Sequence, residues 1–135
     1  MALSIFCVFF ISQVTITSEA DDKKMDRKEF NESIITGNIE YEDWMSDPVA
    51  VSLRYLGPFE GRSQTIQRTN PSAESSDTTQ VVIINEGLLD DSIRAEKYEF
   101  TLKTFNNRWV IYSEEKFRKC WPDRGHTNFS KKPCS

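Results

Sequence analysis

The segment IRAEKYEFTLKTF-NN-RWVIYS, which runs from Ile93 to Ser113, decides the fold. Its first part, up to Phe105, is long and rich in β-branched and aromatic residues, which is typical of a β-strand. Asn106-Asn107 is a two-residue hairpin signal, because asparagine tolerates a positive φ angle. Arg108 begins the returning strand, and the pattern allows this strand to continue as far as Trp121. The segment therefore predicts a long antiparallel hairpin.

The side chains of the first strand change phase within it. Ile93 and Ala95 have one parity, and the apolar residues that follow have the other: Tyr98, Phe100 and Leu102. Successive side chains of a strand point to opposite faces of its sheet, so this change predicts a β-bulge near Glu96-Lys97.

The clearest helix start in the chain is Asp47-Pro48. Asp47 can cap a helix, and Pro48 suits the first helical position because its missing N–H would have no partner there. Gly57 ends the helix. The alternation of apolar residues after Pro48 also allows a strand, but the start and stop signals favour a helix. The apolar face of this helix is expected to consist of Val49, Leu53 and Leu56.

The remaining segments place helices before strands. Residues 21–38 are charged, with a narrow apolar stripe that predicts a helix or a loose lead-in. Arg62 to Arg68 is polar enough for an edge strand, and the β-branched run from Thr79 to Asn85 predicts a buried strand. We therefore expect an α+β fold, in which N-terminal helices pack on a bent antiparallel sheet of about four strands.

This order of elements resembles the NTF2-like (cystatin-like) fold, in which a bent sheet wraps a helix and leaves a cone-shaped cavity. The long strand with its expected bulge fits such a bent sheet. The resemblance is one of fold and implies no particular activity, because the same fold supports many functions.

The N-terminus has the composition of an export signal. Residues 2–16 are mostly apolar, and Ser18-Glu19-Ala20 offers small residues for a signal peptidase, which would leave Asp21 first. The apolar run is shorter than the roughly 20 residues that span a bilayer. The alternative is a buried N-terminal strand or helix. We expect residues 1–20 to be a signal peptide, 21–46 a helical or partly disordered lead-in, and 47–135 the α+β core.

The cysteines agree with export to the periplasm or the cell exterior. Cys7 would leave with the leader, and the two that remain, Cys120 and Cys134, bracket a loop that contains proline and glycine. We expect a structural disulfide, which would stabilise the chain by about 3 kcal/mol. A redox pair is more often Cys-x-x-Cys, and a metal site needs more ligands than two thiols and His126, so we expect no metal.

The loop between these cysteines carries the best candidate binding residues. They are Trp121, Asp123, Arg124, His126, Phe129, Lys131 and Lys132. In a functional interpretation, His126 is an acid or base and Arg124 clamps an anion. In the structural alternative, Arg124 pairs with Asp123 or a loop carbonyl, and His126 bonds to the backbone and sets the shape of the loop.

Positive charge gathers in the same part of the chain. The cations are Lys116, Arg118, Lys119, Arg124, Lys131 and Lys132, with Trp121 and Phe129 between them. They predict an anionic partner, such as an acidic protein, a glycan or a lipid A phosphate. The alternative is a solvated face whose aromatic residues cover the end of the core.

The C-terminal pattern also resembles small exported bacterial proteins of uncharacterised function, which end in Cys-x-Pro-x-Arg-Gly-His-x-x-(Trp/Phe)-Ser-x-x-x-Cys. The matching positions are Cys120, Pro122, Arg124, Gly125, His126, Phe129, Ser130 and Cys134. The resemblance covers roughly residues 47–134. It implies export and a disulfide-closed tail, and it implies no reaction.

These observations predict an exported, non-catalytic binding or accessory protein that needs no cofactor. The 17 basic and 21 acidic residues nearly balance, which argues against nucleic-acid binding and against attraction to an anionic membrane. One alternative is a small-molecule enzyme that uses a cavity, with His126 or a cavity carboxylate as the proton carrier. Another is an inhibitor or immunity protein against an exported toxin or enzyme. The partner is unknown, and the chain is expected to be a monomer or a homodimer.

Overall fold

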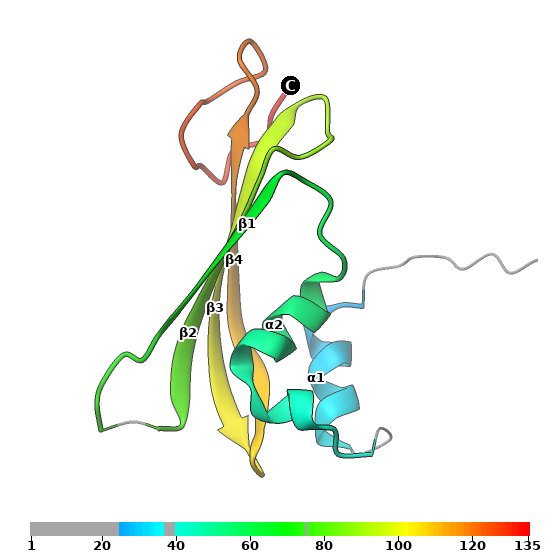
Figure 1. Cartoon of the computed structure of the whole chain (residues 1–135), viewed down its shortest axis with the longest axis vertical. Coiled ribbons are helices and arrows are strands. Elements are labelled where there is room, and N and C mark those ends of the chain that lie inside the picture. The colour runs from blue at the N-terminus through cyan, green and yellow to red at the C-terminus, as the bar shows by residue number, and fades with distance from the viewer. Residues whose placement is uncertain (1–24, 37–39, 75) are drawn as a thin grey trace, which may run out of the picture.

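A computed structural model describes residues 25–36, 40–74 and 76–135 (Figure 1). The predicted signal peptide and Cys7 lie outside these residues. The described chain forms two helices and one four-stranded sheet, which confirms the α+β class. The elements are α1 (Arg27–Ile35), a 3₁₀ turn (Asp43–Ser46), α2 (Pro48–Leu56), β1 (Ser63–Thr69), β2 (Thr78–Glu86), β3 (Ile93–Phe105) and β4 (Arg108–Cys120).

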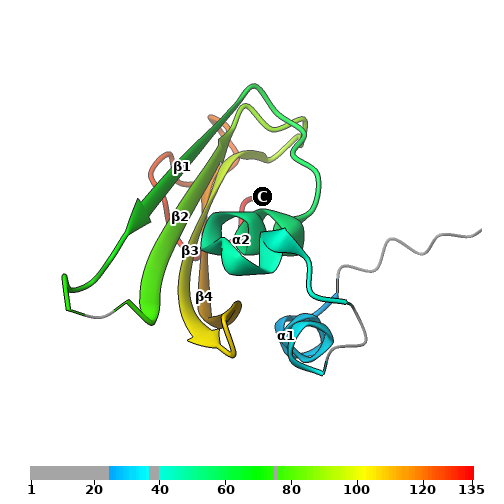
Figure 2. The same ribbon diagram turned by 60° about the horizontal axis from the view of Figure 1, so that its bottom comes forward.

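The sheet is an antiparallel meander in the order β1-β2-β3-β4. It curves around α2, and both helices lie on one side of it (Figure 2). We call this the helix side and the opposite face the far side. The predicted hairpin turn is confirmed, since Asn106 and Asn107 have φ angles of 49° and 60° and join β3 directly to β4.

Helix α2 begins and ends where the sequence predicts. The Asp47 carboxylate accepts a hydrogen bond from the Val49 N–H at 2.9 Å, and Gly57 ends the helix with φ at +80°. The buried residues of α2 are Pro48, Val51, Ser52 and Tyr55, whereas the expected apolar face is only half-buried. A curved sheet covers α2 on more than one side, so a single helical stripe does not describe its contacts.

The core lies between the helices and the sheet. Tyr98, Phe100 and Leu102 of β3 point to the helix side, as their shared parity predicts. They pack against the buried residues of the helices and the other strands: Phe30, Ile34, Met45, Val51, Tyr55, Val81, Ile83, Trp109 and Ile111.

The bulge predicted at Glu96-Lys97 is wrong. The pairing of β3 with β4 is continuous from Ala95 to Thr101, and the register shifts lie at either end of that stretch. Ala95 is nevertheless only 1 % exposed. It is buried on the far side, beside Lys119, which lies under the aromatic ring of Phe129. The change of parity therefore reflects a strand that is covered on both faces, at different points along its length.

Candidate functional site

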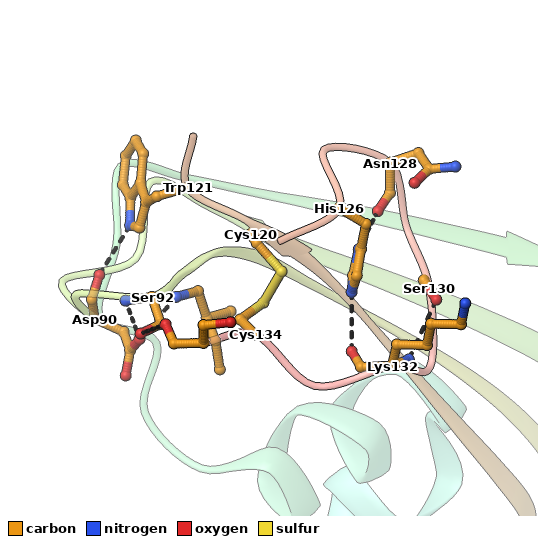
Figure 3. Close-up of a disulfide and its surroundings, with 11 residues drawn as sticks. Asp90, Ser92, Cys120, Trp121, His126, Asn128, Ser130, Lys132 and Cys134 are labelled. Atoms are coloured by element: carbon orange, nitrogen blue, oxygen red, sulfur yellow. Dashed lines mark hydrogen bonds between the residues drawn. A yellow bond between two sulfur atoms is a disulfide. The ribbon is translucent and has the colours of Figure 1, made fainter. Parts of the chain in front are cut away.

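The C-terminal segment 121–135, which we call the tail, is closed onto the end of the sheet. Cys120 and Cys134 form the predicted disulfide (Figure 3). Ser130 pairs with Arg118 of β4 through two backbone hydrogen bonds of 2.8 and 2.9 Å. The Cys120 N–H donates to the carbonyl oxygen of His126 at 2.9 Å. The tail is therefore fixed by one covalent bond and by several backbone bonds.

His126 holds the shape of the tail. Its Nδ1 lies 2.8 Å from the carbonyl oxygen of Asn128, and its Nε2 lies 2.9 Å from that of Lys132 (Figure 3). This geometry supports the structural interpretation of His126 over a role as acid or base. The ring also lies near Cys120 and Cys134, with the three potential metal-binding atoms within 4.8 Å of one another. The two sulfur atoms are bonded to each other, so this cluster is a disulfide beside an imidazole.

Trp121 joins the tail to the loop between β2 and β3, residues 87–92. Its indole N–H donates to the carbonyl oxygen of Asp90 at 2.8 Å, and its backbone N–H donates to that of Ser92 at 2.9 Å. The Ser92 hydroxyl donates to the carbonyl oxygen of Ser135 at 2.6 Å. The backbone N–H groups of Ile93 and Ser92 donate to the Asp90 carboxylate and lower its pKa.

Acidic residues from the sheet neutralise three of the six predicted cations. Lys119 pairs with Glu86 at 3.5 Å, Lys131 with Glu115 at 2.6 Å, and Lys116 with Glu96 at 2.6 Å. These acids lie on β2, β4 and β3.

Two cations of the tail remain available. The side chains of Arg124 and Lys132 make no ion pair or hydrogen bond with any residue that the structure describes. Both residues are exposed, and the turn before Arg124 includes Asp123 with φ at +67°. Of the six predicted cations, three are therefore paired with acids and two, Arg124 and Lys132, remain exposed and available. The sixth, Arg118, is half-buried on β4, and its buried Nε has no hydrogen-bond partner among the described residues.

A separate cavity of about 660 Å³ lies on the helix side, between the end of α2, the loop after it, and strands β2 and β3. We call it the helix-side pocket. Its lining is Met25, Phe30, Arg54, Tyr55, Leu56, Gly57, Pro58, Phe59, Glu60, Asn85, Leu88, Glu96 and Tyr98. Polar and apolar atoms contribute about equally to its exposed wall, so the pocket offers both hydrogen-bonding groups and apolar contact.

The polar groups of the pocket are held by an internal network. The Tyr98 hydroxyl donates to Glu96 Oε2 at 2.6 Å, and Lys116 Nζ lies 2.6 Å from Glu96 Oε1. The Tyr55 hydroxyl donates to Glu114 Oε2 at 2.8 Å. Burial raises the pKa of both tyrosines, and the carboxylate that each one contacts raises it further. Shifted titration of this kind is concentrated at functional sites.

The resemblance in fold implied a cavity, but the sequence did not identify the residues that line this pocket. Its polar residues lie in strands that are distant along the chain, and no motif joins them. One local signal was present, since Asn85 ends an apolar run and is only 8 % exposed, with its side-chain oxygen accepting from Gln64 at 2.9 Å. His126 belongs to the tail and does not line the pocket. The geometry thus separates the predicted histidine from the cavity.

No protein-family model matches the chain, and neither a curated protein nor a solved structure is significantly similar to it. Among the described residues, neither helix has the length and apolar composition that crossing a membrane requires.

Proposed function

We propose that this chain is an exported, non-catalytic binding protein that holds a small organic molecule in the helix-side pocket. The observation that carries the proposal is the pocket itself: a cavity of about 660 Å³ whose lining combines aromatic residues with the hydrogen-bonded pair Tyr98 and Glu96. Both carboxylate oxygens of Glu96 are engaged, one by Tyr98 and one by Lys116. These two contacts fix the orientation of the carboxylate, and its remaining lone pairs can still accept a hydrogen bond from a ligand.

The chemistry of the lining favours an uncharged, amphipathic ligand. Apolar surface is offered by Leu56, Phe59 and Leu88. Asn85 and Glu96 offer polar atoms. The charge of Glu96 is balanced by Lys116, and the lining contains one further cation, Arg54, and one further acid, Glu60, so the pocket favours no net charge.

The adjacent residues Leu88 and Leu89 provide a matched test. Leu88 lines the pocket, whereas Leu89 is 83 % exposed and does not. The uncharged fluorescent amine N-phenyl-1-naphthylamine is titrated into the mature protein. We expect Leu88→Ala to weaken binding of this dye about fivefold or more, since it removes apolar contact worth about 1 kcal/mol. We expect Leu89→Ala to leave the affinity unchanged. Equal effects of the two substitutions, or no binding by the unmodified protein, would reject the pocket.

Export and the finer fold class are part of the same proposal. The disulfide of the tail supports an oxidising compartment, because such bonds persist mainly in secreted and periplasmic proteins. The curved meander that wraps α2 supports an NTF2-like (cystatin-like) arrangement (Figure 2). Intact-mass analysis of the protein purified from its native host tests export: the product should begin at Asp21 and contain no free thiol.

A second candidate function is the docking of an anionic partner on the tail. The observation that favours it is the pair of cations, Arg124 and Lys132, displayed on a loop that the disulfide and His126 make rigid. A preorganised loop loses little conformational entropy when it binds. The partner would carry carboxylates, phosphates or sulfates, as the sequence predicts.

The structure decides which substitutions test this second function. His126→Ala would disturb the loop itself, so the clean variant is Arg124→Ala combined with Lys132→Ala. This double variant should bind an isolated partner with at least tenfold lower affinity, and dye binding in the pocket should be unchanged. The control, Lys131→Ala, removes a cation that Glu115 already neutralises. Retention of full affinity by the double variant would exclude the tail as the docking face.

A further inference from the structure

The two edges of the sheet differ in how far other described segments cover their backbone groups. At the β4 edge, the Asn31 amide of α1 behaves like a neighbouring strand: its Nδ2 donates to the carbonyl oxygen of Ile111 at 2.8 Å, and its Oδ1 accepts from the Ile111 N–H at 3.0 Å. Arg27 donates to the carbonyl oxygen of Tyr112. Ser130 of the tail pairs with Arg118 at the other end of the strand. Helix α1 and the tail thus occupy backbone groups that would otherwise attract another chain.

The β1 edge has no such cover among the described residues. Six of the seven residues of β1 are exposed, and only Gln64 is half-buried. The strand, SQTIQRT, contains no proline and no lysine, which are the residues that usually protect an edge. Its one charged residue, Arg68, is turned inward, because its Nε lies 3.3 Å from Thr79 Oγ1 and its guanidinium lies over the Trp109 ring.

We infer that β1 pairs antiparallel with β1 of a second copy of this chain, which joins the two sheets into one. This inference concerns assembly and does not depend on the proposed ligand. A two-fold axis at Ile66, the middle residue of the strand, makes the edge complementary to itself. Alternate N–H and C=O groups of an antiparallel edge point outward, so each copy supplies the donors that the other lacks.

The side chains that this pairing brings opposite each other are also compatible. Ile66, which is 40 % exposed, meets its own symmetry mate, and Thr65 meets Gln67. Gln64 meets Arg68, so no like charges face each other across the axis. The covered β4 edge cannot form the same pairing. The second copy is therefore the occupant that the composition of β1 favours, rather than an unrelated acidic or basic strand.

The register can be tested with two nearly identical variants. Thr65 and Gln67 both pair with residues whose side chains face the far side, away from the pocket, and both are exposed. The variant Thr65→Lys/Gln67→Lys places lysine opposite lysine at two points across the axis, which is destabilising. The variant Thr65→Lys/Gln67→Glu places lysine opposite glutamate at the same two points and should restore the pairing.

The molar mass of the mature protein is measured by sedimentation equilibrium over a wide concentration range. We expect a dimer for the unmodified chain, a dissociation constant at least tenfold higher for the lysine–lysine variant, and recovery for the lysine–glutamate variant. Circular dichroism confirms that each variant is folded. A monomeric unmodified chain, or equal behaviour of the two variants, would overturn the inference.

Discussion

The helix-side pocket and the tail lie at the same end of the sheet but are stabilised in different ways. The pocket is lined by side chains that distant elements bring together, and its polar groups are satisfied within the core network. The tail depends on the Cys120–Cys134 bond and on hydrogen bonds to backbone atoms. The loop of residues 87–92 touches both, since Leu88 lines the pocket and Asp90 bonds to Trp121. The difference suggests that the tail can be loosened without loss of the pocket.

Removal of the disulfide should have the largest effect and should separate the two regions. Replacing Cys120 and Cys134 together by serine should reduce the free energy of unfolding by about 3 kcal/mol on the chain-entropy model. Hydrogen exchange resolved by peptide should show lost protection in the tail and retained protection in β3. Equal loss of protection in both would mean that the two regions unfold as one unit.

A substitution at Tyr98 tests whether the polar network of the pocket contributes to stability. Tyr98→Phe removes the hydroxyl that donates to Glu96 and should reduce the free energy of unfolding by about 1 kcal/mol, measured in urea. Tyr112→Phe is the matched control, because Tyr112 is 61 % exposed on β4. Removal of the Tyr112 hydroxyl should change the free energy of unfolding by less than about 0.5 kcal/mol. A similar loss in both variants would argue against the network.

The same tyrosine predicts the response to alkaline pH. Burial and Glu96 raise the pKa of Tyr98 in the folded chain above the ordinary value of 10.0. The unfolded chain therefore loses this proton first as pH rises, so the contribution of Tyr98 to stability is constant below about pH 10 and falls above it. Because the pKa of Tyr55 is also raised, Tyr98→Phe should make the alkaline decline less steep without abolishing it in urea unfolding experiments. An unchanged slope would show that the hydroxyl titrates normally.

The contrast between the regions also explains what the sequence could predict. The cap at Asp47, the turn at Asn106 and the disulfide at Cys120 depend on a few adjacent residues or on the small number of cysteines, so their signals are visible in the chain. The partner of Lys119 lies two strands away in β2, and no local pattern reveals it.

The wrong prediction has the same origin. The supposed bulge at Glu96-Lys97 came from treating β3 as a strand with one buried face. The tail covers part of the other face, and that contact joins segments far apart in the sequence. The lining of the pocket was missed for an equivalent reason, because its polar residues become neighbours only when the sheet curves around α2 (Figure 2).

Trp121 tests whether the tail influences the pocket through the loop between β2 and β3. Trp121→Phe keeps an aromatic ring but removes the N–H that donates to Asp90, at an expected cost of about 0.5–1 kcal/mol. Because Leu88 belongs to the same loop, dye affinity in the pocket should fall about twofold, which corresponds to roughly 0.4 kcal/mol. A stability loss with unchanged dye affinity would show that the pocket is independent of the tail.

The smallest effect should come from the more exposed of two ion pairs, one beside the tail and one beside the pocket. Lys131 and Glu115 are 61 % and 52 % exposed on the tail side, whereas Lys116 and Glu96 are 35 % and 16 % exposed beside the pocket. Lys131→Ala should change the free energy of unfolding by less than about 0.5 kcal/mol, because solvent screens an exposed pair. Lys116→Ala should cost about 1 kcal/mol, since it leaves Glu96 partly buried without its cation. Urea unfolding at low salt and at about 1 M salt should show that salt weakens the Lys131 effect most. If both substitutions cost the same, the polar network at the pocket would have no special role in stability.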